Sequence, residues 1–177
     1  MITFRALTGS DARKIEDIDR SEHVTLGYRF QGGVLEEEEV DWHIPRWTEN
    51  AVAEFNISER ITEFQSKIAK GDRVIGAFDA DLLVGFAVLR VKLTEDMAQL
   101  SELFVSREYR RRGIASELVS EMIALARASK AARLYVSSVP SESAVGFYLN
   151  QGFQPTQEVH PHLFELEPED IHMTLDL

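Results

Sequence analysis

The feature that most constrains this chain is an apolar strand pattern that runs through an arginine-rich turn into a long amphipathic helix. Residues 98 to 105 are mostly apolar, as in a buried strand, and residues 113 to 128 repeat apolar side chains at helical spacing. Consecutive arginines at 110 to 112 stand between these two segments, and Gly113 opens the helix. A strand joined to a helix in this way indicates an α/β fold.

The remaining patterns predict one mixed α/β domain over residues 1–177, with a mostly antiparallel central sheet flanked by helices. Two strand patterns, 73–78 and 82–91, flank a polar turn and predict a hairpin. Residues 21 to 47 give a poor signal because glycine and proline interrupt them, and we expect an irregular or partly helical segment there. Further strands are expected at 2–6, 134–136, from 153 onward and at 171–175, and further helices at 12–19, 57–68 and 141–151.

The charge balance and the lack of cysteine exclude several classes of protein. With 30 acidic against 19 basic side chains, the formal net charge is −11, which disfavours binding to a nucleic-acid backbone. No cysteine is present, which excludes disulfides, thiolate nucleophiles and cysteine-bound zinc and leads us to expect a cytoplasmic protein. No apolar stretch is long enough to cross a membrane, and residues 1–5 lack the layout of a secretory signal.

The arginine-glycine turn has the chemistry of an anion cradle. N–H groups at the start of a helix have no partner within it, and the helix dipole adds partial positive charge there. Gly113 and Ala115 leave room for a diphosphate to approach the backbone beside the forked donors of the arginines. A solvated basic turn before an ordinary helix is the alternative. The Gly-Lys-Ser/Thr ending of a nucleoside-triphosphate loop and the three-glycine dinucleotide pattern are both missing.

At this turn the sequence resembles the GNAT superfamily of N-acetyltransferases, which use acetyl-coenzyme A. The resemblance rests on Arg110-x-x-Gly113-x-Ala115 after the strand Glu102-Leu103-Phe104-Val105, on Ala144, Phe147-Tyr148 and Gly152-Phe153 at the expected distance, and on the final strand 171–175. It is specific over residues 73–175 and weak before them. It implies a GNAT fold, with 73–175 as the cofactor-binding core and 20–70 as the acceptor-side segment.

The resemblance also implies which residues hold the cosubstrate. Backbone N–H groups across Arg111 to Ser116 would bind the pyrophosphate, and main-chain groups of Leu103 and Val105 would meet the pantetheine arm. Two departures from the family pattern are Arg111, where many relatives have glycine, and Ser141, where many have asparagine. The full set of expected cofactor-binding residues is Leu103, Phe104, Val105, Arg110, Arg111, Arg112, Gly113, Ile114, Ala115, Ser116, Ser138, Ser141, Ser143 and Phe147.

Two residues are the candidates for proton transfer. Tyr148 matches the family's general acid, and its ordinary pKa of about 10 keeps the hydroxyl protonated at neutral pH, so that a proton is available to a departing thiolate. Simple packing beside Phe147 is the alternative. Glu102 interrupts an apolar strand and is the candidate general base; a solvent-facing strand residue, or proton transfer by ordered water, are the alternatives. Strand N–H groups near Leu103 and Phe104 are expected to stabilise the oxyanion.

We therefore expect direct acetyl transfer from acetyl-CoA to a primary amine of a small molecule or peptide. The lack of cysteine favours direct transfer over a thioester on the enzyme. No metal is expected, because His160, His162 and His172 lack the spacing of a metal site. A non-catalytic acyl-CoA sensor is the main alternative, and a nucleic-acid-binding domain that uses residues 107–112 is a third. An exposed late strand leaves a homodimer open.

Weaker features bear on the acceptor. The acidic run Glu36 to Glu39 is expected to be a solvated helix face, with attraction of a cationic amine as the alternative. Trp42, His43 and Trp47 either wall an acceptor pocket or form a satellite hydrophobic cluster. The acidic balance of the chain favours a cationic small molecule.

Overall fold

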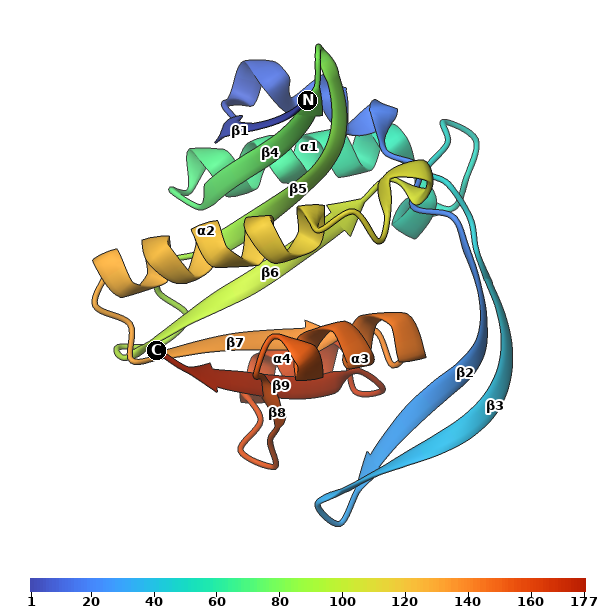
Figure 1. Ribbon diagram of the computed structural model, residues 1–177, viewed down its shortest axis with the longest axis vertical. Coiled ribbons are helices and arrows are strands. Elements are labelled where there is room, and N and C mark those ends of the chain that lie inside the picture. Colours follow the sequence, from blue (N-terminus) through green and yellow to red (C-terminus); the bar gives the residue numbers. More distant parts are fainter.

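A computed structural model describes the backbone of residues 1–177 and every side chain except that of Ala53. Its centre is a seven-stranded sheet in the order β1-β4-β5-β6-β7-β9-β8, in which the β6–β7 pair is parallel and the other pairs are antiparallel (Figure 1). This confirms the prediction of a mixed α/β fold with a mostly antiparallel sheet. The strands are β1 (Ile2–Ala6), β4 (Arg73–Asp79), β5 (Leu82–Arg90), β6 (Met97–Val105), β7 (Arg133–Ser138), β8 (Gln154–Pro155) and β9 (Ile171–Asp176).

The expected helices form, and local capping explains where they begin. Asn56 accepts a hydrogen bond from the Glu59 N–H at the start of α1 (Ile57–Ala69), and Ser141 caps α3 (Glu142–Asn150) in the same way. α2 (Ile114–Ala128) follows Gly113. The predicted first helix is a 3-10 helix, η1 (Gly9–Asp17), with the expected capping box at Thr8. Two short 3-10 helices, η2 (Ala53–Phe55) and η3 (Arg107–Tyr109), and α4 (Pro161–Leu166) were not predicted.

The expectation of an irregular or helical segment over residues 21 to 47 is wrong. Two long strands, β2 (Glu22–Gln31) and β3 (Val34–Ile44), pair there as an antiparallel hairpin that curves along one side of the molecule (Figure 1). Gly32 and Gly33 form the two-residue turn with φ values of 60° and 84°, the left-handed conformation that tight hairpin turns require. The run Glu36 to Glu39 therefore lies on a strand and not on a helix face.

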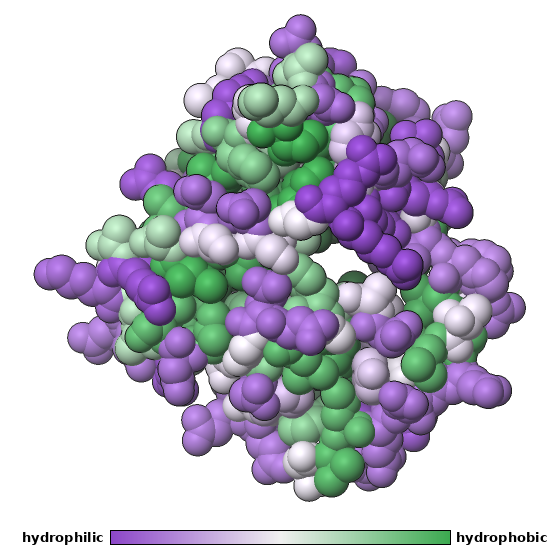
Figure 2. Space-filling model, viewed as in Figure 1, coloured by the Kyte–Doolittle hydropathy of each residue, from purple (hydrophilic) through white to green (hydrophobic). Residues whose placement is uncertain are grey.

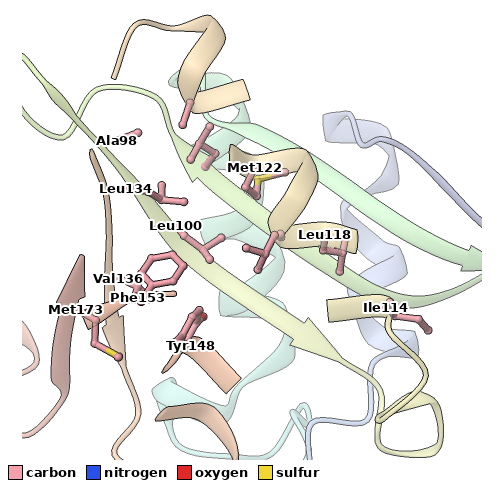
Figure 3. Close-up of a cluster of buried hydrophobic side chains, with 14 of the residues drawn as sticks. Ala98, Leu100, Ile114, Leu118, Met122, Leu134, Val136, Tyr148, Phe153 and Met173 are labelled. Carbon is pink, nitrogen blue, oxygen red and sulfur yellow. The ribbon is translucent and has the colours of Figure 1, made fainter. Parts of the chain in front are cut away.

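The two faces of the sheet carry different hydrophobic clusters. α2 covers one face, where Leu118 and Met122 pack over Leu100 and Leu134 (Figure 3). η1 and α1 cover the other face, where the Phe64 ring of α1 meets Phe86 edge-on with centroids 5.3 Å apart. No helix in the described part of the chain is long and apolar enough to span a membrane.

β6 and β7 separate soon after they begin. Their parallel pairing covers only Met97–Gln99 and Arg133–Tyr135. An irregularity in the β5–β6 register at Ser101, between the pairs Val88–Glu102 and Leu89–Leu100, marks a bulge in β6 just beyond this pairing. The two strands then diverge towards their carboxyl ends and leave a gap in the centre of the sheet (Figure 1).

Candidate active site

The second half of β6 offers a main-chain edge to the gap. The Ser106 N–H donates to the Val84 oxygen at 2.8 Å, so the main-chain groups of Phe104, two residues earlier, also point towards β5. By the same alternation, the main-chain groups of Leu103 and Val105 point into the gap. The edge at Leu103 is thus free for the expected pantetheine contact, whereas at Val105 the main-chain oxygen already accepts a hydrogen bond from Arg110. The expectation that the Phe104 N–H stabilises an oxyanion needs correction, because that N–H belongs to the ladder with β5.

The turn that follows β6 forms a concave row of backbone donors. Arg111 and Gly113 both have left-handed backbones, with φ values of 60° and 79°. Alternation of such residues with ordinary ones turns successive N–H groups to one side, as in anion-binding nests. Among the residues that the structure describes, none accepts a hydrogen bond from the N–H groups of residues 111 to 116. A Cβ atom at Gly113 would meet nothing within 4 Å, so the space beside this row is open.

The three arginines of the turn differ in what their side chains do. The Arg110 guanidinium donates to the main-chain oxygens of Val105 and Arg20, at 3.2 and 3.1 Å, and pairs with Glu22 at 3.3 Å. It therefore joins β6 to the start of β2 and is not free for an anion. Arg111 and Arg112 are exposed. Hydrophilic side chains gather over this segment, above a hollow in the surface (Figure 2).

The serines expected near the pantetheine arm hold the start of α3. Ser141 accepts from the Ala144 N–H at 3.3 Å and shares a 3.2 Å hydrogen bond with Ser143, whose hydroxyl donates to Glu22 at 2.7 Å. Ser138 donates to the oxygen of Val139 at 3.0 Å. All three hydroxyls are engaged within the protein.

Tyr148 reaches from α3 towards the place where β6 and β7 separate. Its ring packs edge-on against Phe147 and Phe153, with centroids 5.3 Å apart in each case, and lies near Leu100 (Figure 3). Its hydroxyl has no hydrogen-bond partner in the described residues, yet it is not among the atoms sealed from solvent. Burial raises the pKa of Tyr148, and negative charge on Asp170 raises it further. The hydroxyl is thus protonated, without a hydrogen-bond partner and not sealed from solvent, which are properties that a proton donor needs.

Glu102 is held by two cations on the face of the sheet that α1 covers. Arg60 donates to one carboxylate oxygen at 2.5 Å, and Lys67 bonds the other. The Glu102 side chain is only 6% exposed, so the alternative in which it faces solvent is wrong. Its partners come from α1, and this local arrangement explains how an apolar strand tolerates a carboxylate. Its assignment as a base stays a prediction.

Sequence reasoning missed Asp170, which lies just before β9. The residue lines a cavity of about 760 Å³ between the β2–β3 hairpin and the segment around α4. Burial, with the charge of Glu167, raises the pKa of the Asp170 carboxyl to about 7. Nothing in the sequence distinguishes Asp170 from the neighbouring exposed acids, because its burial arises only when α4 and the hairpin pack around it.

The aromatic residues near the end of β3 have separate positions. Trp42 lines the cavity of about 760 Å³. Trp47 belongs to the hydrophobic cluster under α1, where its ring meets the Phe104 ring edge-on with centroids 5.0 Å apart. This agrees with the interpretation of Trp47 as part of a satellite hydrophobic cluster. His43 is exposed and stacks on His23 with ring centroids 4.2 Å apart.

Histidines are the side chains to consider for a metal. Both ring nitrogens of His172 are bonded within the protein, to the Tyr135 hydroxyl at 2.7 Å and to the main-chain oxygen of Glu167 at 3.1 Å. On the exposed face of the hairpin, His23, Asp41 and His43 bring potential ligand atoms within 4.8 Å of one another. This group differs from the one considered from sequence, and its Asp41 oxygen already lies 2.7 Å from His23 Nε2.

Comparisons with known proteins agree with this geometry. The sequence model described as acetyltransferase (GNAT) domain matches residues 43–162. No curated protein sequence matches the chain significantly.

Among solved structures, nourseothricin acetyltransferase is 18% identical, with a TM-score of 0.73 over 99% of this chain and 98% of that one. A structure described as a putative streptothricin acetyltransferase from Bacillus anthracis, in complex with acetyl-coenzyme A, is 18% identical, with a TM-score of 0.74 over 100% and 99%. PaiA N-acetyltransferase from Thermoplasma acidophilum, in complex with coenzyme A, is 18% identical, with a TM-score of 0.66 over 100% and 99%. These likenesses show the fold.

The family match covers most of the chain, including the main-chain edge of β6, the turn at residues 110 to 116 and Tyr148. The chain therefore belongs to the GNAT family of acetyl-CoA-dependent N-acetyltransferases.

Proposed function

We propose that this acetyltransferase moves the acetyl group directly to a primary amine of a small molecule or peptide. The observation that carries the proposal is the unpaired row of N–H groups at residues 111 to 116, which lies at the open end of the gap. The whole chain acts as one domain in this proposal. Residues 73–175 bind the cosubstrate, and the acceptor meets the segment that contains the hairpin.

The residues of the turn suit a pyrophosphate. Its row of N–H groups and the positive end of the α2 dipole provide donors and charge, and exposed Arg111 and Arg112 add to both. The open space beside Gly113 lets an anion reach the backbone. Arg110 supports the turn through its main-chain contacts instead of binding the anion itself. The main-chain groups of Leu103 and the N–H of Val105 offer the pantetheine amides a strand-like partner, while the Val105 oxygen is held by Arg110.

Tyr148 is proposed as the acid that protonates the departing thiolate. Its raised pKa keeps the hydroxyl protonated throughout the neutral range, so the proton is available when the carbon–sulfur bond breaks. The Leu103 N–H, which points into the gap, is the proposed donor to the oxyanion. Because the chain has no cysteine, no thioester between the acetyl group and a protein thiol can form before the amine is acetylated.

Cofactor binding at the turn is tested by thermal unfolding with and without acetyl-CoA. At about one hundred times its dissociation constant, the ligand should add roughly 2.7 kcal/mol and raise Tm by about 5–10 °C. Gly113→Trp should abolish this rise, because its side chain would occupy the open space beside the N–H row.

Gly71→Trp is the matched control. Gly71 also has a positive φ, at 98°, and open space around its Cβ position, but it lies at the end of α1. The control therefore has the same backbone strain and should keep the ligand-induced rise. Equal rises in both variants would contradict binding at this turn. A rise without thiol release across a panel of primary amines would favour the acyl-CoA sensor over the enzyme.

A further inference from the structure

A cavity of about 760 Å³ lies where the β2–β3 hairpin meets the segment after β7. Pro140, two residues beyond β7, and Ile171, the first residue of β9, both line it, and β9 pairs with β7 through Ile171 and Ser138. The turn proposed to bind pyrophosphate follows the carboxyl end of β6. The cavity thus adjoins the carboxyl end of β7, and the turn adjoins the carboxyl end of β6.

The wall of this cavity is aromatic and acidic. The hairpin contributes the rings of Tyr28 and Trp42, and the segment around α4 contributes the ring of Phe164. Its ionisable side chains are Glu38, Glu169 and Asp170 against Arg29, with His172 beside them. Arg29 is already paired with Glu38 at 2.5 Å, so the remaining charge of the wall is negative. Aromatic faces and carboxylates together favour a cation.

Asp170 differs from the other acids of this wall. It is half-buried, and its carboxylate has neither an ion pair nor a hydrogen bond among the described residues. Glu38, by contrast, is paired, and Glu169 is exposed. A half-buried carboxylate without a partner is costly unless it meets a ligand. Ile171 pairs with Ser138, so Asp170 lies at the carboxyl end of β7, where the strand borders the gap. The negative charge of Asp170 also raises the pKa of the Tyr148 hydroxyl.

We infer that this cavity receives the acceptor, a small primary amine with a second positive charge, and that Asp170 takes a proton from its ammonium group. This inference rests on the proposed acetyl transfer and names its acceptor site and its base. Asp170 then acts on the substrate nitrogen, while Glu102 stays paired with Arg60 and Lys67. The second charge of the acceptor lies towards Glu169 and the aromatic rings of the hairpin.

The proton and bond changes balance in this arrangement. The Asp170 carboxylate takes one proton from the ammonium, and the nitrogen lone pair then forms a bond to the acetyl carbonyl carbon. As the carbon–sulfur bond breaks, the sulfur takes the proton of the Tyr148 hydroxyl, and the resulting phenolate recovers a proton from the new amide nitrogen. Asp170 returns its own proton to water through the cavity. The sum is an amide, a free thiol and one released proton.

The pH profile of kcat/KM distinguishes a base from a merely structural carboxylate. Since the pKa of Asp170 is about 7, the kcat/KM of the parent enzyme should rise about tenfold per pH unit below pH 7 and become constant above it. The groups that face Asp170 are Tyr148 from α3, Arg29 and Tyr28 from β2, Glu38 from β3, His172 from β9, and Glu167 and Glu169 from its own segment. Of these, burial raises the pKa of Tyr148 and lowers that of His172, so neither is expected to produce a limb near 7.

Asp170→Asn is the variant to measure, with thiol release from acetyl-CoA as the readout. At pH 7.5 its kcat/KM should fall about a hundredfold, and its profile should keep rising towards the pKa of a free amine, about 10. Glu165→Gln, an exposed acid of α4 outside the cavity wall, is the matched control and should keep the parent profile. The amine panel should include 1,5-diaminopentane and pentylamine, and the diamine should have at least a tenfold higher kcat/KM.

Each result has a distinct meaning. An Asp170→Asn enzyme with the parent's rate and profile would overturn the assignment of the base while leaving the acetyltransferase in place. Preference for pentylamine over the diamine would overturn the second positive charge. Acetyl-CoA binding without turnover on any primary amine would remove both the proposed function and this inference. A shifted profile in Asp170→Asn alone, with acetyl-CoA binding unchanged, is the supporting result.

Discussion

Glu102→Gln is expected to lower the free energy of unfolding by about 3–5 kcal/mol. The substitution removes the charge that Arg60 and Lys67 share, and these two side chains are only 17% and 18% exposed. Two cations would then lie close together in a largely buried site with their main counter-ion gone. Urea unfolding at pH 7 measures the loss, read from the midpoint at constant slope.

Glu63→Gln is the matched control for this prediction. Glu63 pairs with the same Arg60 and Lys67, but its side chain is 48% exposed. Water screens such a pair, and the expected loss is at most about 1 kcal/mol. Equal losses in the two variants would contradict the view that the buried carboxylate holds this cluster together. The kcat of folded Glu102→Gln also tests whether Glu102 is the general base. An unchanged kcat would contradict that assignment.

Tyr148→Phe is expected to lower kcat by about a hundredfold to ten-thousandfold, the usual contribution of a positioned general acid. The ring would keep its contacts with Phe147 and Phe153, because only the hydroxyl is removed. That hydroxyl has no hydrogen bond to lose in the described residues, so stability should change little. Steady-state kinetics with saturating acetyl-CoA measures the effect.

The same variant controls for indirect effects. The Tm of Tyr148→Phe and its rise with acetyl-CoA should match those of the parent, which would place the loss in the chemical step. A kcat within about twofold of the parent would assign Tyr148 to packing alone, the alternative that the sequence left open. A loss of the ligand-induced rise would instead show a role in binding.

Sequence patterns predicted most of the sheet because strands with few interruptions carry local signals. β4, β5 and β6 were recognisable from apolar runs and a polar turn, and α2 from its periodicity. The β2–β3 hairpin was missed because one of its strands holds the run Glu36 to Glu39, which local propensity does not favour in a strand. Its two-glycine turn, between residues that alternate in burial, was the signal that could have identified it.

The candidate site was only partly predictable, because only part of it is formed by residues that are close together in the sequence. The turn at residues 110 to 116 is continuous in sequence, and the unpaired N–H groups that suit it to an anion follow from its local geometry. The environment of Glu102 depends on Arg60 and Lys67, which lie 42 and 35 residues away along the chain. Asp170 depends on the packing of a hairpin and of a short helix that were not predicted. Burial of an ionisable group is a tertiary property, and no local pattern reports it.

The free edge of β6 and the row of donors at the turn have a consequence for how such a protein can diverge. In the proposed function both bind the acetyl donor through peptide groups, and every residue except proline supplies an N–H and an oxygen for this. The cavity proposed for the acceptor instead presents particular rings and carboxylates on the hairpin and near α4. Substitutions can therefore accumulate in the hairpin and change the amine that is accepted, while the half that holds the acetyl donor keeps its specificity. Specificity for the acetyl donor would then depend mainly on the backbone, and specificity for the acceptor would depend mainly on side chains.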